Sequence, residues 1–312
     1  MSEVLTYKPI QVLSYDPTKT LTLRTAFVAD MNRRFKALIK VIKEAIVEQD
    51  CFGLEVLTQA ELTPPYSQAF NFPSVQEKVS AFMEWLKIQE ERGLLETSQN
   101  WRIGTSLQEA WTNLYIEDSY KRGVQRARYE MKKNGYEVPT TEASGGIDAI
   151  MGASFHVDHV GIAYIRAFTE LQGITAAMDT VISEVLAQGL IDGDGARLIA
   201  RKLEALISGK GLGELGITDK RGRFIPAQQR ARTLARTEII RAHHLANIQE
   251  YKNWKVLGVQ VTAEFSTAGD DRVCSQCAGY HGNRYTLQEV EFMIPVHPNC
   301  RCIALPITKL IK

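Results

Sequence analysis

Four of the five cysteines lie together near the C-terminal end of the chain, in two groups separated by a spacer. The first group is Cys274 and Cys277, and the second is Cys300 and Cys302, with His297 three residues before Cys300. A two-residue gap lets two thiolates bind one ion from a tight turn, and a second pair completes a tetrahedral zinc site. The sequence therefore predicts a structural Zn²⁺ module here.

These five side chains compete for four positions, so the ligands are either four cysteines or three cysteines and His297. We expect the intervening Arg301 to hold Cys300 and Cys302 apart, which favours His297 together with one of them. Reduced, packed thiols without a metal and disulfides are the two alternatives. Disulfides are disfavoured because residues 1–4 do not resemble the start of a secretory signal. Cys51 stands alone and is interpreted as a small buried residue.

The composition limits the kinds of protein that this chain can be. Its 312 residues allow one large domain or two ordinary ones, and 45% hydrophobic residues are enough for a sizeable core. The net charge of +1 requires any affinity for nucleic acid to come from a local patch. We expect no membrane partner, because no apolar run approaches the roughly 20 residues that span a bilayer.

Hydrophobic periodicity predicts helices over most of the chain, interrupted by glycine and proline. Ser74 and Glu77 have the spacing of a capping box at a helix start, and Gly135 is expected to end another helix. The expected regions are an N-terminal arm, a helical partner-docking region, a second helical region, and a long basic helix followed by the Cys/His module: residues 1–20, 21–150, 151–225 and 226–312.

Three other patterns carry little chemistry. His156 and His159 lack a nearby carboxylate-rich motif, and we interpret them as ordinary polar positions. The turn that begins at Asp192 has Leu203 where a calcium loop needs a glutamate. Lys210 is followed by glycine and no strand precedes it, so this segment is not a phosphate-binding loop.

The predicted helix from Ala227 to about Lys255 is the most basic part of the chain. One face carries small and aliphatic residues that allow close packing, namely Ala235, Ile239, Ala242 and Ala246. Arg232, Arg236, Arg241 and the pair His243-His244 are then expected to face solvent, a partner or phosphate. Residues 256–265 alternate as a strand does, and residues 285–287 and 302–307 could pair with it.

The expected fold is thus a mainly α N-terminal region and an α+β C-terminal domain. That domain has a long helix and a small sheet around a zinc-type Cys/His site.

A set of residues in this domain resembles a known family. Arg236-Thr237-Glu238 lies on the long helix, Asp271 precedes the Cys-x-x-Cys pair, and the ending reads His-Pro-Asn-Cys-Arg-Cys with Arg301 between the last two cysteines. This arrangement, over roughly residues 185–306, resembles the C-terminal domain of tailed-phage minor head proteins. The family is named after protein F of phage Mu and the head-morphogenesis protein of phage SPP1.

The resemblance implies a virion component rather than an enzyme. Such a protein would lie inside the head, associate with the phage portal protein and with capsid or scaffold components, and contact DNA without sequence preference. It would be present in the host cytoplasm during assembly. Thr237, Glu238, Asp271 and Arg301 belong to the family motif without an assigned role, whereas Arg232, Arg236 and Arg241 are the candidate contacts to DNA or a partner.

Two other functions remain open from the residues. A zinc-dependent, nuclease-like enzyme acting on DNA would need an open metal position and a base, for which Glu238 or Asp271 is available. A DNA-binding regulator would need a recognition helix between the ligand pairs, where the spacer instead contains Gly279, Gly282 and Pro295.

Overall fold

The computed structural model describes residues 16–55, 68–91, 95, 110–211 and 224–309. These residues form two compact units, and each unit is discontinuous in sequence. The first unit contains residues 1–27, 109–167 and 233–312, and the second contains residues 28–108 and 168–232. The expected arm over residues 1–20 lies largely outside the described residues.

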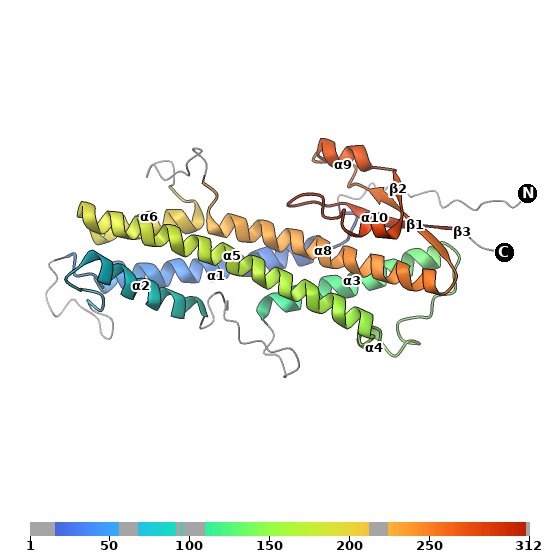
Figure 1. Cartoon of the computed structure of the whole chain (residues 1–312), viewed down its shortest axis with the longest axis horizontal. Helices are drawn as coiled ribbons and strands as arrows, with labels where there is room; N and C mark the ends of the chain where they lie inside the picture. The colour runs from blue at the N-terminus through green and yellow to red at the C-terminus, as the bar shows by residue number, and fades with distance from the viewer. Residues whose placement is uncertain (1–15, 56–67, 92–94, 96–109, 212–223, 310–312) are drawn as a thin grey trace, which may run out of the picture. The chain divides into compact units, whose positions relative to one another are not determined.

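The described chain is mostly helical, with a small sheet at its C-terminal end (Figure 1). This confirms the coarse fold class expected from the sequence. The helices are α1 (Leu21–Lys43), the π-helix η1 (Glu44–Glu48), α2 (Val75–Gln89), α3 (Trp111–Lys133), α4 (Ile147–Met151), α5 (Ser154–Asp192), α6 (Ala196–Ser208), α8 (Ala227–Val256), α9 (Ser275–Tyr280) and α10 (Leu287–Glu291). The strands are β1 (Gln260–Ser266), β2 (Arg284–Tyr285) and β3 (Ile303–Lys309).

Local sequence signals set several of these boundaries. Ser74 caps α2 by accepting a hydrogen bond from the Glu77 amide, and the Glu77 carboxylate accepts one from the Ser74 amide, which confirms the predicted capping box. Gly135 follows α3 with a φ of 88°, a backbone conformation that costs glycine little. The α6 helix ends in the same way at Gly209, which has a φ of 83°.

The second unit has an aromatic core. Phe52, Phe70, Phe82 and Trp85 form a group in which ring centroids lie 5.3–6.1 Å apart. Phe82 is completely buried on the inner face of α2. Burying aromatic side chains removes a large apolar area from water, so this unit is held together mainly by the hydrophobic effect.

In the first unit, α3 and α8 approach each other closely. The predicted seam of α8 is confirmed, since Ala235, Ile239, Ala242 and Ala246 are completely buried. Opposite this seam lies Gly123, where an added Cβ atom would lie only 2.4 Å from the His243 carbonyl oxygen. The Ser119 hydroxyl also donates a hydrogen bond of 2.6 Å to the Ile239 carbonyl oxygen. Glycine at position 123 is therefore a packing requirement of this helix pair.

The expectation that His243 and His244 face solvent or a partner is wrong. Both are 1% exposed, because α8 is covered on more than the one face that the small residues predicted. Burial, together with nearby Arg126, lowers the pKa of His243 to about 3. Burial likewise lowers the pKa of His244 to about 4, and its Nε2 atom lies 2.9 Å from the Val290 carbonyl oxygen.

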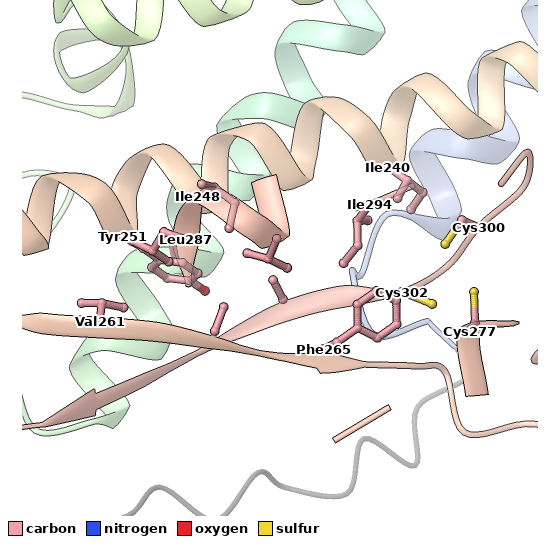
Figure 2. Packing of buried hydrophobic residues seen from close by; sticks show 14 of the residues in the cluster. Ile240, Ile248, Tyr251, Val261, Phe265, Cys277, Leu287, Ile294, Cys300 and Cys302 are labelled. Atoms are coloured by element: carbon pink, nitrogen blue, oxygen red, sulfur yellow. The ribbon is translucent and has the colours of Figure 1, made fainter. Parts of the chain in front are cut away.

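The sheet is antiparallel with the strand order β2-β1-β3. Strand β1 pairs with β3 along its length, from Gln260 opposite Lys309 to Ser266 opposite Ile303. Alternate β1 residues Val261, Ala263 and Phe265 join Ile248 of α8 in one buried cluster, at one side of which lie Cys277, Cys300 and Cys302 (Figure 2). The predicted small sheet beside a long helix is therefore confirmed, although Val256 belongs to α8 and Leu287 to α10 rather than to strands.

Helix α5 differs from the sequence expectation in its hydropathy. It is long and apolar enough to cross a membrane by length and composition alone, with a mean hydropathy of 1.3 over its best window, of which 33% is buried. The sequence has no unbroken apolar run here, because charged residues interrupt the aliphatic ones, among them Arg166, Glu170 and Asp179. Core helices of soluble proteins pass the same test, and the expected absence of a membrane partner stays a prediction.

Candidate metal centre

The first two thiols are positioned by the start of α9. Cys274 is the residue that caps this helix, and its Sγ atom accepts a hydrogen bond of 3.3 Å from the Cys277 amide. One helical turn then carries the Cys277 side chain into the buried cluster, whereas Cys274 stays half-buried. The two-residue gap therefore directs both thiols to one place, as the sequence predicted.

The second pair lies just before β3. Cys300, Cys302 and Cys277 are all buried, and their sulfur atoms lie within 4.8 Å of one another. The expectation that Arg301 would hold Cys300 and Cys302 apart is therefore wrong. In extended backbone, residues two apart point to the same side and the residue between them points away, so Arg301 separates nothing.

His297 completes the group. Its Nδ1 atom lies 2.8 Å from the carbonyl oxygen of Pro298. Because a carbonyl only accepts hydrogen bonds, the proton of the neutral ring lies on Nδ1, and the lone pair of Nε2 is free. That Nε2 atom lies 3.3 Å from the sulfur of Cys274 and 3.2 Å from the sulfur of Cys277. A histidine held in this way is typical of metal ligands, whose second ring nitrogen donates to a backbone carbonyl.

All five candidates thus converge in two overlapping groups that share Cys277. The ligand atoms of Cys274, Cys277 and His297 form one group, and those of Cys277, Cys300 and Cys302 form the other, each within 4.8 Å. None of the cysteines forms a disulfide. Soft thiolates with one imidazole suit Zn²⁺, and a mostly buried donor set suits a closed structural site. Because no four atoms form a single group, either ligand set remains open.

The thiols are electrostatically poised for a cation. Burial raises the pKa of Cys277 to about 12. A hydrogen bond from Cys302 lowers the pKa of Cys300 to about 5, and the same bond together with burial raises the pKa of Cys302. Within this pair the pKa of Cys300 is lowered and that of Cys302 is raised, so Cys300 gives up its proton more readily. A bound divalent cation would compensate the remaining charge and favour deprotonation of every ligating thiol.

An ion pair holds the two cysteine-bearing segments together. Arg301 forms a two-pronged ion pair with Asp270, with both distances 2.7 Å, and so ties the second cysteine pair to the segment before Cys274. These hydrogen bonds hold the pKa of the Asp270 carboxyl well below its usual range. The sequence motif pointed to Asp271, which is exposed, whereas Asp270 makes the contact.

Thr237 gives the helical part of the motif a structural role. Its hydroxyl donates to the Thr233 carbonyl oxygen at 2.7 Å and accepts a hydrogen bond of 3.1 Å from the Asn299 amide. Asn299 has a φ of 63°, the left-handed conformation that asparagine tolerates. Thr237 therefore fixes the turn that delivers Cys300, and α8 positions the second half of the centre.

Glu238 is buried and bound by arginine side chains. Its carboxylate lies 3.1 Å from Nε of Arg241 and 3.7 Å from Nε of Arg166. A general base needs a lone pair directed at the proton that it removes, and here those lone pairs face guanidinium groups. The geometry supports a structural role for Glu238, and it pairs the charge of Arg241 within the protein.

The other two candidate arginines lie in different units. Arg236 is exposed in the first unit. Burial lowers the pKa of Arg24, and the charges of Arg301 and Arg236 lower it further. Arg232 is in the second unit, where its Nε atom donates to Oδ1 of Asn32. Arg236 is therefore the exposed candidate of the first unit, and it forms no ion pair with any residue that the structure describes.

A row of buried, hydrogen-bonded polar side chains was not predicted from the sequence. His156 is completely buried, with Nδ1 at 3.1 Å from the Tyr120 hydroxyl and Nε2 at 2.9 Å from Oε1 of Glu250. It is therefore a core residue that joins α3, α5 and α8, rather than an ordinary polar position. No local sequence signal predicts this contact, because Tyr120, His156 and Glu250 lie on three different helices.

The first unit is thus defined by a long helix, a three-stranded sheet and a Cys/His group that could hold a metal ion. Residues 180–305 match the family model described as Phage Mu protein F like protein. The match contains α8 and all five candidate ligands, and it confirms the resemblance seen in the sequence. No curated protein and no solved structure matches the chain.

Proposed function

We propose that this protein is a minor head protein that acts in head morphogenesis of a tailed phage. The observation that carries the proposal is the family match over residues 180–305, a region that contains the complete Cys/His centre and the helix that positions it. The contacts of Thr237, Glu238 and Arg301 support a structural function, since each of these motif residues holds the module together.

The centre holds a structural Zn²⁺ ion in this proposal. Cys277 is the shared ligand, Cys300 and Cys302 lie beside it, and Cys274 and His297 compete for the remaining position. When bound, zinc crosslinks chain segments that the small sheet alone would hold weakly, because a three-stranded sheet is near the lower limit of independent stability.

The proposed partners are the phage portal protein and capsid or scaffold components, with the virion head as the location. Electron cryo-microscopy of intact particles that carry this chain tests the proposal directly. Density for the chain inside the head, next to the portal, is the expected result. Density on the tail or the outer capsid surface, or a protein absent from mature particles and unnecessary for filling heads, contradicts it.

DNA contact is assigned to Arg236, the exposed arginine beside Arg24 and Arg301. Phosphate contacts are independent of sequence and are weakened by salt. Replacing Arg236 with glutamine should reduce the salt slope of binding by about one, with Arg272→Gln as the control that removes an exposed arginine of the same unit. An unchanged slope assigns Arg236 to a protein partner or to solvent.

The alternative, a zinc-dependent nuclease, has a separate test. A nuclease would cleave plasmid with an added divalent ion and lose that activity in Glu238→Ala. Absence of cleavage with any ion removes this alternative.

A further inference from the structure

The second unit contains an open cleft with a volume of about 700 Å³. It is lined by the C-terminal half of α1, by η1, by the end of α6 and by the start of α8. Helix α6 packs against η1, so these walls belong to one packed body. The volume lies in the range of ligand-binding pockets, roughly 300–1,000 Å³.

The charges that line this cleft are mixed, with basic residues in excess. Its basic side chains are Lys36, Lys40, Lys43, Lys210 and Arg232, and its acidic side chains are Glu44, Glu48 and Glu204. The lining therefore has a formal charge of +2 in a chain whose net charge is +1.

Much of this charge is already paired. Lys43 lies 2.7 Å from Glu204, and Lys40 lies 3.4 Å from Glu44. Such pairs, exposed to water, contribute little to stability and can exchange partners at small cost.

Two cations in the cleft lack an acidic partner among the described residues. Lys36 is exposed and forms no ion pair there, whereas Arg232 donates to the neutral side chain of Asn32. Gln228, which is 3% exposed, also donates to Asn32 and helps to fix the Arg232 side of the cleft. Arg232 is therefore preorganised, with a charge that no carboxylate of the described chain neutralises.

We propose that this cleft binds an acidic peptide segment of a partner protein, with Lys36 and Arg232 pairing its carboxylates. Complementary charge selects partners and orients them. A nucleic-acid strand carries negative charge on every phosphate, and Glu44 and Glu48 would repel it along one wall. A peptide that carries both signs of charge can meet the basic and the acidic residues together. The proposal does not rest on the proposed zinc site or DNA contact.

The test uses the full-length protein and a fluorescein-labelled peptide of glutamate and alanine with one lysine, which is acidic overall but carries both signs of charge. Binding is followed by fluorescence anisotropy at low salt. The native protein should bind this probe, and Lys36→Gln with Arg232→Gln should weaken binding about tenfold, because each lost pair contributes up to about fivefold. Arg232→Lys should restore part of the loss. The control is Arg197→Gln with Arg201→Gln, which removes two exposed arginines of α6 that do not line the cleft.

Three results overturn the proposal. The first is native protein that does not bind the acidic peptide. The second is an equal loss of affinity in the α6 control, which would show general attraction to a basic surface. The third is an oligothymidine probe that binds more tightly than the peptide and loses affinity in the cleft variant, which would assign the cleft to nucleic acid. A circular dichroism spectrum of each variant separates lost binding from lost folding.

Discussion

The aromatic core of the second unit and the Cys/His module of the first unit are held together in different ways. The second unit buries Phe52, Phe70 and Phe82 among helices, so its stability comes from apolar surface removed from water. The module has short helices, a small sheet and a group of thiols. We propose that this chain combines a region stabilised by apolar packing alone with a region in which a bound ion adds to the packing of a smaller buried cluster.

The largest expected effect is loss of the module when its metal is removed. Chelation or Cys277→Ser should remove zinc-dependent folding free energy on the order of 10 kcal/mol, because Cys277 belongs to both ligand groups. Hydrogen exchange should show β1 and β3 losing protection while α2 keeps its own. Cys51→Ser, outside the centre, is the matched control and should leave metal binding unchanged. Equal loss of protection in α2 would show that the two regions do not differ in this way.

The opposite effect is expected from Phe82→Ala, which opens a cavity in the aromatic core. This change should destabilise the second unit by about 3–5 kcal/mol without altering the bound metal. Differential scanning calorimetry with metal analysis measures both properties. Phe72→Ala is the control, since Phe72 is 41% exposed. If the Phe82→Ala variant also loses its metal, the module depends on the aromatic core of the second unit.

Acid should weaken the core beneath the module through His243 and His244. Their pKa values are lowered in the folded state to about 3 and about 4, so the unfolded chain takes up protons first as the pH falls below about 6.5. Each histidine should therefore cost about 1.4 kcal/mol per pH unit between about pH 6 and its folded pKa. Urea unfolding of native protein and His243→Gln measures this, and identical slopes would contradict the assigned burial.

A smaller effect is expected from Thr237→Val, which keeps the shape of the side chain and removes its hydroxyl. The Asn299 amide then loses its acceptor, at a cost of about 1 kcal/mol, and the turn before Cys300 loosens. Zinc transfer to a chromophoric chelator should become faster. Thr233→Val, whose carbonyl rather than hydroxyl takes part in the contact, is the control. Unchanged transfer would leave Thr237 with a role in helix packing alone.

Patterns that depend on neighbours in sequence were predicted well. The capping box at Ser74, the small-residue seam of α8 and the three strands all follow from side-chain periodicity or from local hydrogen bonds. The Cys/His convergence was predictable for a related reason, because ligand spacing limits how two turns can face one ion.

Features that depend on distant contacts were missed. The burial of His243 and His156 depends on which helices cover α8 and α5, and single-sequence periodicity records only one covered face. Arg301 was expected to hold its flanking cysteines apart, but it pairs with Asp270 while the sulfur atoms of Cys300 and Cys302 lie within 4.8 Å of each other. Asp270 and Arg301 are 31 residues apart, so their ion pair leaves no signal in the local sequence.

The metal content of the purified protein tests the central claim most directly. Elemental analysis of the native chain, with Cys277→Ser as the matched variant, should give about one zinc per chain for the native protein and a large loss for the variant. Replacement by cobalt should give the absorption bands of a tetrahedral thiolate site. A native protein that contains no metal, and whose melting is unchanged by a chelator, would contradict the account.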